Sequence, residues 1–302
     1  MSGFTSIDLS KLPAPDVIKT VEYEVLLAEM KAECIRLMPE LEVYLTLESE
    51  PTSQLLRVCA YYRMLDRLEF NDGARANMLA LSTGTNLDQL SAFWGVERLV
   101  LQEADNSVSP PIAEIKESDD AFRQRVQLSL EVHTTAGPRG SYIFWARSAS
   151  GNVKDVSVES PTPGEVVVTI LSSEGDGSPS ADLLIGVVAA LNDDAVRPLT
   201  DHVTVQAATI TSYQVEASLI LYEGPDADTV QTAAETALNA YIETHHRLGH
   251  DITLSGIHAA LHQAGVQNVL ITQPLADIVV GPAEAAFCAV DDIAISVGGR
   301  DV

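Results

Sequence analysis

Apolar side chains between residues 16 and 41 recur at intervals of three and four, the spacing that places them on one face of a helix. One stripe of this expected helix consists of Ile18, Val21, Val25, Ala28, Ala32 and Ile35. A second stripe, on the neighbouring face, consists of Tyr23, Leu27, Met30, Cys34, Leu37 and Leu41. Two adjacent stripes are wider than one partner helix can cover, so we expect this helix to lie inside a bundle. The helix should end or kink at Pro39. All of these residues except Tyr23 and Cys34 are candidate partner-binding positions.

The rest of the first hundred residues also has a helical pattern. Helices are expected over 53–70, 74–81 and 87–94, with a break at 71–73 and with Asn86 as the cap of the last helix. Residues 1–16, which contain Pro13 and Pro15, cannot bury much apolar surface. We therefore expect them to form an arm that orders only against another surface.

The pattern changes after residues 102–111, whose prolines and small polar side chains make them the best candidate linker. Helices are then expected at 119–132, 141–148, 180–192, 227–246 and 255–263, and strands at 153–158, 165–171, 202–206, 215–222, 266–273 and 293–297. From residue 211 the succession of strand and helix repeats. The sequence predicts an α+β chain with an N-terminal helical domain (1–104) and two small α/β domains (105–209 and 210–302), each an open sheet covered by helices.

The charge of the chain excludes two classes of partner. Its 18 Lys and Arg oppose 43 Asp and Glu, a net charge of −25, so nucleic acid phosphates and anionic lipid would repel it. From Asp155 onward only Arg197, Arg247 and Arg300 oppose 21 acidic residues. That half is either a solvated acidic surface that limits aggregation or a surface that docks a basic protein.

Cysteine usage and hydropathy indicate an intracellular, soluble protein. The three cysteines, Cys34, Cys59 and Cys288, have no paired spacing, so neither a disulfide framework nor a zinc knuckle is expected. The first residues lack the basic and apolar regions of a secretory signal. The longest apolar run, Leu183–Leu191, is far shorter than the ~20 residues of a membrane span.

No sequence motif for nucleotide binding or for a serine nucleophile is present, since GxxxxGK[ST], GxGxxG and GxSxG are all absent. The densest candidate chemistry is a histidine cluster, His245, His246, His250, His258 and His262. His258 and His262 have the i, i+4 spacing that can grip one metal, with Asp251 as a further ligand, but the Glu of a zinc peptidase is missing. Alternatively, His245 and His246 meet the negative end of a helix that Gly249 follows, and the cluster serves capping and surface roles.

The carboxylates also lack a catalytic arrangement. The pairs Asp119–Asp120, Asp193–Asp194 and Asp291–Asp292 are adjacent in sequence, so their side chains diverge in regular structure. Arg123 and Arg125 lie near Glu117 and Asp119 and are expected to form local helix ion pairs worth a few tenths of a kcal/mol. No catalytic residue, metal or cofactor is predicted.

Several ordered segments resemble one known family, the baseplate J-like proteins of contractile-tailed phages. The resemblance rests on residues 83–90 (TGTNLDQL) with 95–98 (GVER), 117–125 (ESDDAFRQR), 134–138 (TTAGP) with Ser141–Tyr142, 153–156 (VKDV), 160–166 (SPTPGEV) and 196–201 (VRPLTD). In order, these segments cover most of the chain. Their glycines and prolines set turns and are not reactive groups.

The resemblance implies a structural wedge component of a tail baseplate, found in the virion tail and, during assembly, in the host cytoplasm. In that family two copies per wedge are held by helices bundled with tail protein I, and later domains join six wedges into a ring. The chain is then expected to be no enzyme, to associate with itself, and to bind tail protein I and other wedge proteins. Its acidic second half becomes a candidate wedge-to-wedge surface.

Two other functions compete with this structural role. One is a metal-assisted hydrolase that uses His258, His262 and a third ligand from His245, His246, His250 or Asp251. The other is an acidic adaptor of a different intracellular complex.

Overall fold

The computed structural model describes residues 7–13, 15–133, 137–194, 196–224 and 226–301. It divides between Glu97 and Arg98 into a helical unit and a larger unit that contains both main sheets. Residues 1–6 and 14 of the expected arm, and the 134–136 part of one family-like segment, lie outside the described residues. The α+β class predicted from the sequence is confirmed.

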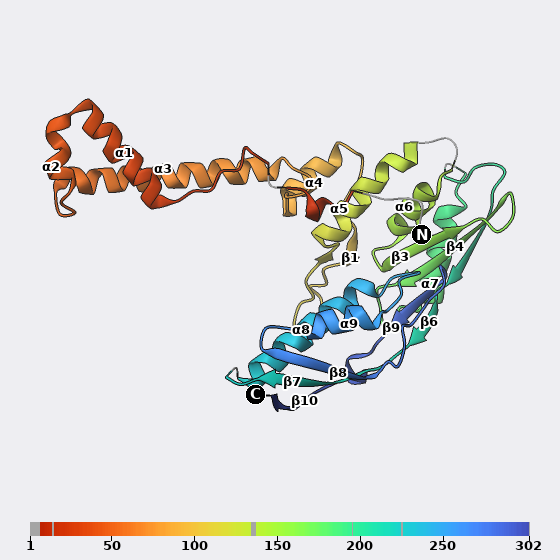
Figure 1. The fold of residues 1–302 in the computed structure, drawn as a ribbon. Coiled ribbons are helices and arrows are strands. Elements are labelled where there is room, and N and C mark those ends of the chain that lie inside the picture. The colour runs from red at the N-terminus through yellow and green to blue at the C-terminus, as the bar shows by residue number, and fades with distance from the viewer. Residues whose placement is uncertain (1–6, 14, 134–136, 195, 225, 302) are drawn as a thin grey trace. The chain divides into compact units, whose positions relative to one another are not determined.

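The helical unit is built around a hairpin in which α1 packs against the longer α3 (Figure 1). Its elements are η1 (Leu9–Lys11), α1 (Tyr23–Leu37), η2 (Pro39–Leu41), α2 (Glu42–Leu45), α3 (Pro51–Ala76) and α4 (Gly84–Ala92). Helix α1 ends just before Pro39, as expected from the missing N–H of proline. None of the described helices is long and apolar enough to cross a bilayer.

Helix α1 begins at Tyr23, so the prediction of helix from residue 16 was wrong and Ile18 and Val21 precede the helix. The buried Asn71 of α3 explains the late start. Its side chain accepts a hydrogen bond from the Lys19 N–H at 3.3 Å and donates one to the Lys19 carbonyl at 2.8 Å. Both backbone groups that a helix would use at Lys19 are therefore bonded to α3.

The same Asn71 accounts for a second error, the predicted break at residues 71–73. Because its side chain bonds Lys19, it does not compete for the backbone of its own helix, and α3 continues to Ala76. The third predicted helix, 74–81, is therefore only the end of α3 and the turn that follows. Helix α4 begins at Gly84 with Thr83 at the N-cap position, earlier than the predicted cap at Asn86.

The larger unit alternates helices and strands. Its helices are α5 (Asp119–Leu128), η3 (Ser129–His133), α6 (Arg139–Ala149), α7 (Ala181–Leu191), α8 (Ala227–His245), α9 (Leu254–Leu261) and η4 (Val290–Asp292). Its strands are β1 (Val100–Gln102), β2 (Ile115–Lys116), β3 (Val153–Glu159), β4 (Glu165–Ser172), β5 (His202–Ala207), β6 (Thr209–Ser212), β7 (Val215–Tyr222), β8 (Val266–Gln273), β9 (Glu284–Phe287) and β10 (Ile293–Asp301). The Ser118 and Ser180 hydroxyls accept backbone N–H bonds and cap α5 and α7.

The central sheet has the order β3-β4-β5, and helices α6 and α7 pack on it. Strand β4 pairs antiparallel with β3 and parallel with β5, and α7 makes the crossover that a parallel pair needs. Val168 and Ile170 of this middle strand are fully buried, with Val187 and Leu191 of α7 in the same core. The core supplies the stability that an open three-stranded sheet would lack alone.

The C-terminal sheet has the order β10-β7-β8 and is covered by α8 and α9 on one face (Figure 1). Along β7 the buried residues Val215, Ala217, Leu219 and Leu221 alternate with more exposed ones, the period of a half-buried strand. Its middle strand comes first in the chain, whereas the middle strand of the central sheet comes second. The repeat expected from residue 211 therefore holds for the kinds of element, strands and helices. The strand order of the two sheets differs.

The segment predicted as a linker, residues 102–111, folds back on itself. Strands β1 and β2 pair antiparallel, and Asp105 forms a bridge with Ile112 between them. Two further short strands, β6 and β9, pair in parallel and were not predicted. Each has only four residues, too few to show a period.

A buried ion pair joins α5 to Glu117, the residue that follows β2. Arg125 donates from Nε and Nη2 to the two carboxylate oxygens of Glu117 at 3.0 and 2.8 Å, and both side chains are at least 93% buried. Arg98 bonds Asp119 at 2.7 Å and lies over the fully buried ring of Phe122. The prediction of a weak local helix pair at Arg125 was wrong, because Leu99 and, from α6, Ser148 also bond this pair, at 3.2 Å each.

Replacing Arg125 with Met should lower the free energy of unfolding by about 3–5 kcal/mol, because Glu117 would be left buried and unpaired. Thermal or urea denaturation measures the loss. The matched control is Arg75→Met, which removes the exposed Arg75–Asp72 pair and should cost less than about 1 kcal/mol. Equal effects of the two substitutions would contradict the importance of the buried pair.

Candidate functional site

The helical hairpin leaves one apolar stripe of α1 uncovered. Val25 is 49% exposed, and Ala28 and Ala32, at the following positions of the same stripe, are exposed as well. On the second stripe Leu27 is only 6% exposed, and Tyr23 donates its hydroxyl to the Arg57 carbonyl of α3 at 3.5 Å. The start of the second stripe therefore packs on α3, and Val25, Ala28 and Ala32 in the middle of the first stripe remain available.

Helix α3 carries a matching uncovered stripe. Leu55, Val58, Tyr62 and Leu65 follow one another at intervals of three and four, and they are 38–64% exposed. The buried residues of this 26-residue helix are Ser53, Ala60 and Asn71, none of them a large apolar side chain. A helix with this burial pattern lacks the apolar contacts that usually stabilise a helix in water.

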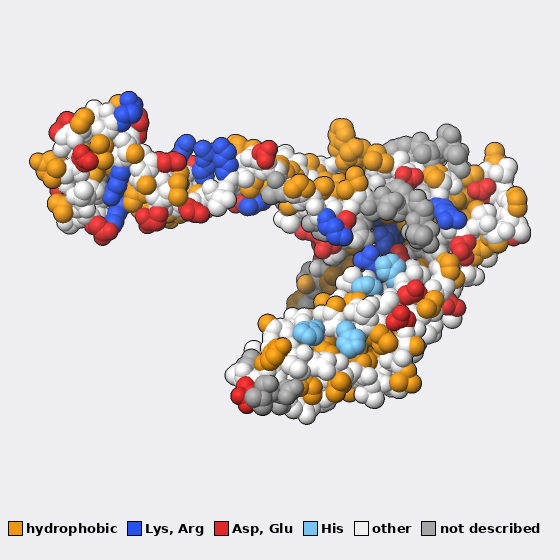
Figure 2. Space-filling model, viewed as in Figure 1, with side chains coloured by type: hydrophobic (Ala, Val, Ile, Leu, Met, Phe, Trp, Pro, Cys, Tyr) orange, Lys and Arg blue, Asp and Glu red, His pale blue; other side chains and the backbone are white. Residues whose placement is uncertain are grey.

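Apolar side chains also collect at the end of the hairpin where α1 and α3 are joined. Leu37, Val43, Tyr44 and Leu47 are 51–73% exposed there. Figure 2 shows hydrophobic side chains over much of the visible surface of this hairpin, interspersed with charged groups. Exposed apolar surface of this extent marks a protein-binding site more often than a free surface.

The ten predicted partner-binding residues fall into three environments. Val25, Ala28, Ala32 and Leu37 are exposed, Leu27 is buried, and Ile18, Val21, Met30, Ile35 and Leu41 are half-buried. Tyr62 and its neighbours on α3 were predicted as helical but not as binding residues. Their spacing carried the same signal as α1, and only the structure shows that no described residue covers them.

The histidine cluster does not form a metal site. Among the described residues, no group of three or more His, Cys, Asp or Glu side chains is placed to hold a metal ion. His258 and His262 are exposed, and His245 bonds the Tyr241 carbonyl one turn earlier, as a capping side chain does. His246 is the C-cap residue of α8, but at 6% exposure it is not the surface group that was predicted.

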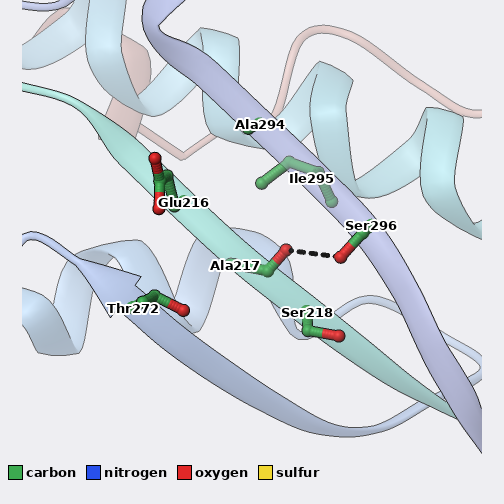
Figure 3. A pocket seen from close by; sticks show the side chains of 7 residues that line it. All are labelled: Glu216, Ala217, Ser218, Thr272, Ala294, Ile295 and Ser296. Atoms are coloured by element: carbon green, nitrogen blue, oxygen red, sulfur yellow. Dashed lines mark hydrogen bonds between the residues drawn. The ribbon is translucent and has the colours of Figure 1, made fainter.

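The clearest hollow on the surface offers little for catalysis. It lies on the outer face of the C-terminal sheet, has a volume of about 260 Å³, and is lined mainly by small or neutral side chains of β7, β8 and β10 (Figure 3). Glu216 is the one titratable side chain that lines it, and Ser296 donates a hydrogen bond to the Ala217 carbonyl at 3.4 Å.

Comparison with known proteins agrees with this geometry. Three family models match the chain: the Baseplate J-like N-terminal domain over residues 48–105, the central domain over 134–207 and the C-terminal domain over 213–289. Baseplate protein J of Escherichia phage P2 is 46% identical over 98% of this chain and 99% of its own length. The chain belongs to the baseplate J-like family. The resemblance read from the sequence is thereby confirmed.

A solved structure is also similar to this baseplate J-like chain. It is a chain from the cryo-EM structure of the anti-feeding prophage baseplate, with a TM-score of 0.42 and 13% identity. The similarity covers 64% of this chain and 49% of that chain, so the chain matches about half of that larger subunit. The N-terminal family model begins at residue 48 and includes α3 but not α1.

The two stripes of α1 should respond differently to a buried charge. Leu27→Asp should lower the unfolding free energy of the helical unit by about 3 kcal/mol or more, because the carboxylate would be buried without a partner. Val25→Asp should change it by less than about 0.5 kcal/mol, because that side chain is half exposed. Circular dichroism during urea unfolding measures both, and a large loss for Val25→Asp would show that its stripe is packed.

Proposed function

We propose that this chain is a structural component of a phage contractile-tail baseplate, located in the virion tail, that is needed for baseplate assembly. The carrying observation is its 46% identity over nearly the full length of Baseplate protein J of Escherichia phage P2. The uncovered stripes of the hairpin support a role in assembly, because a protein that works by binding needs apolar surface left free for its partners.

Within the baseplate, we infer that the hairpin binds the helices of tail protein I. Two copies of the chain would bundle with one copy of that partner, and the Val25 stripe of α1 and the Tyr62 stripe of α3 would lie at the interface. Support comes from their three-and-four spacing, which fits knobs-into-holes packing, and from their lack of charge. Further contacts, through the acidic second half, would hold six such wedges in a ring.

The proposed function does not include catalysis. The alternative of a metal-assisted hydrolase would need His258, His262 and a third ligand on one ion. The described residues do not bring three such side chains together, and His245 and His246 have structural contacts of their own.

Coexpression with tail protein I and native mass spectrometry tests the proposal. A stable complex with two copies of this chain and one of the partner is expected. The double variant Val25→Asp/Ala28→Asp should abolish the complex and leave the chain folded, because charges in a closed helical interface cost several kcal/mol.

The matched control places the same two charges on exposed alanines of α8. Ala233→Asp/Ala240→Asp should form the complex as the unaltered chain does. If the α1 variant still assembles, the interface lies elsewhere. If the unaltered chain stays monomeric with tail protein I and does not co-purify with intact tails, the baseplate function itself is contradicted.

A further inference from the structure

The central and C-terminal sheets of the larger unit are fastened at a joint that includes a buried histidine. His246, at the C-cap of α8, is 6% exposed, and its Nδ1 lies 3.2 Å from the Lys154 ammonium of β3. The same ammonium lies 2.6 Å from a carboxylate oxygen of Glu243, one turn earlier on α8. One lysine of the central sheet thus contacts two side chains at the end of α8.

Other contacts at this joint are arranged around the histidine. Asp155, next to Lys154, accepts a hydrogen bond from the Leu248 N–H at 3.1 Å and pairs with Arg147. The His246 ring packs near Phe287 of β9, at 5.4 Å between ring centres. A small core beside it joins Leu171 and Ala208 to Ala285, with Leu248 packed against them.

The hydrogen bond to Lys154 fixes the protonation state of His246. A lysine ammonium has three donors and no acceptor, so Nδ1 must be the acceptor and the ring must be neutral with its proton on Nε2. Nε2 faces the turn after β4, where a Cβ on Gly177 would lie 2.9 Å from it. Among the described residues no acceptor has full hydrogen-bond geometry at Nε2, although the Asp176 backbone interacts favourably with the ring.

We propose that His246 makes this joint a proton-sensitive switch: the neutral ring fastens α8 to β3, and the protonated ring releases it. Protonation removes the acceptor for Lys154 and puts a second positive charge 3.2 Å from the ammonium. Because the His246 ring is buried and the Lys154 side chain is mostly so, the repulsion is relieved by separating α8 from β3. This inference does not depend on the proposed function.

The charged groups around His246 determine the direction of the effect. Burial, and after it the Lys154 charge, lowers the pKa of His246 below its usual 6.5, while Glu243 of α8 and Asp176 of the turn act in the opposite direction. A released histidine regains its ordinary pKa, so the released state binds more protons below pH 6.5. The joint is therefore fully stable above pH 6.5 and weakens as the pH falls below it, until the pKa of the fastened state is passed.

Hydrogen–deuterium exchange of the full chain tests this switch. After correction for intrinsic exchange rates, the amides of residues 243–248 and 174–178 should lose protection between pH 7.5 and 5.5, by at most about tenfold per pH unit for one proton. In His246→Gln, whose amide oxygen can still accept from Lys154, protection should be the same at both pH values. The control His262→Gln, at an exposed site, should behave as the unaltered chain.

Constant protection in the unaltered chain, or a pH-dependent loss that persists in His246→Gln, would overturn the proposal. If His246→Gln does not fold, nitrogen NMR of the histidines in the unaltered chain decides. A neutral Nε2–H ring at pH 7.5 that becomes charged over the pH range in which protection is lost supports the switch. A ring that carries its neutral proton on Nδ1, or that titrates without any loss of protection, contradicts it.

Discussion

A hairpin of two helices can bury only one face of each, and this geometric limit determines what the helical unit can do. Leu27 of α1 takes the buried side, and the equally regular stripe that contains Val25 is left outside. Helix α3 is in the same position, with Tyr62 more than half exposed. The apolar area that would complete a core within a larger bundle is available to other chains, and burial gains about 25 cal/mol for each Å² removed from water.

The larger unit, by contrast, buries its apolar side chains within itself. Its two main sheets each have a buried core, and the Glu117–Arg125 pair is enclosed together with Phe122. Its stability is therefore supplied from within, whereas the helical unit buries few large apolar side chains of its own. A chain divided in this way can exchange contacts at the hairpin while its sheets remain folded.

The regular elements were predictable where periodicity is strong. Strands β7 and β8 were predicted at their observed bounds, because their apolar residues are bounded by turn residues. Errors arose where a distant side chain overrides the local pattern: Asn71 binds Lys19, which delays α1 and extends α3. The sequence also showed that α1 has two stripes, but which stripe stays uncovered depends on the packing of α3. In the same way, the sequence around His246 does not indicate that Lys154, far away in the chain, donates to its ring nitrogen.

The strand order of the C-terminal sheet has a consequence for how the protein is made. Strand β7 lies between β8 and β10, so both of its neighbours are synthesised after it, and the stretch from Tyr222 to Ile293 must be translated before the second one arrives. Until then one long edge of β7, with its unpaired backbone groups, is open to pairing with other chains. The hairpin, residues 23–76, is synthesised before either main sheet, so it can fold while the rest of the same polypeptide is still on the ribosome.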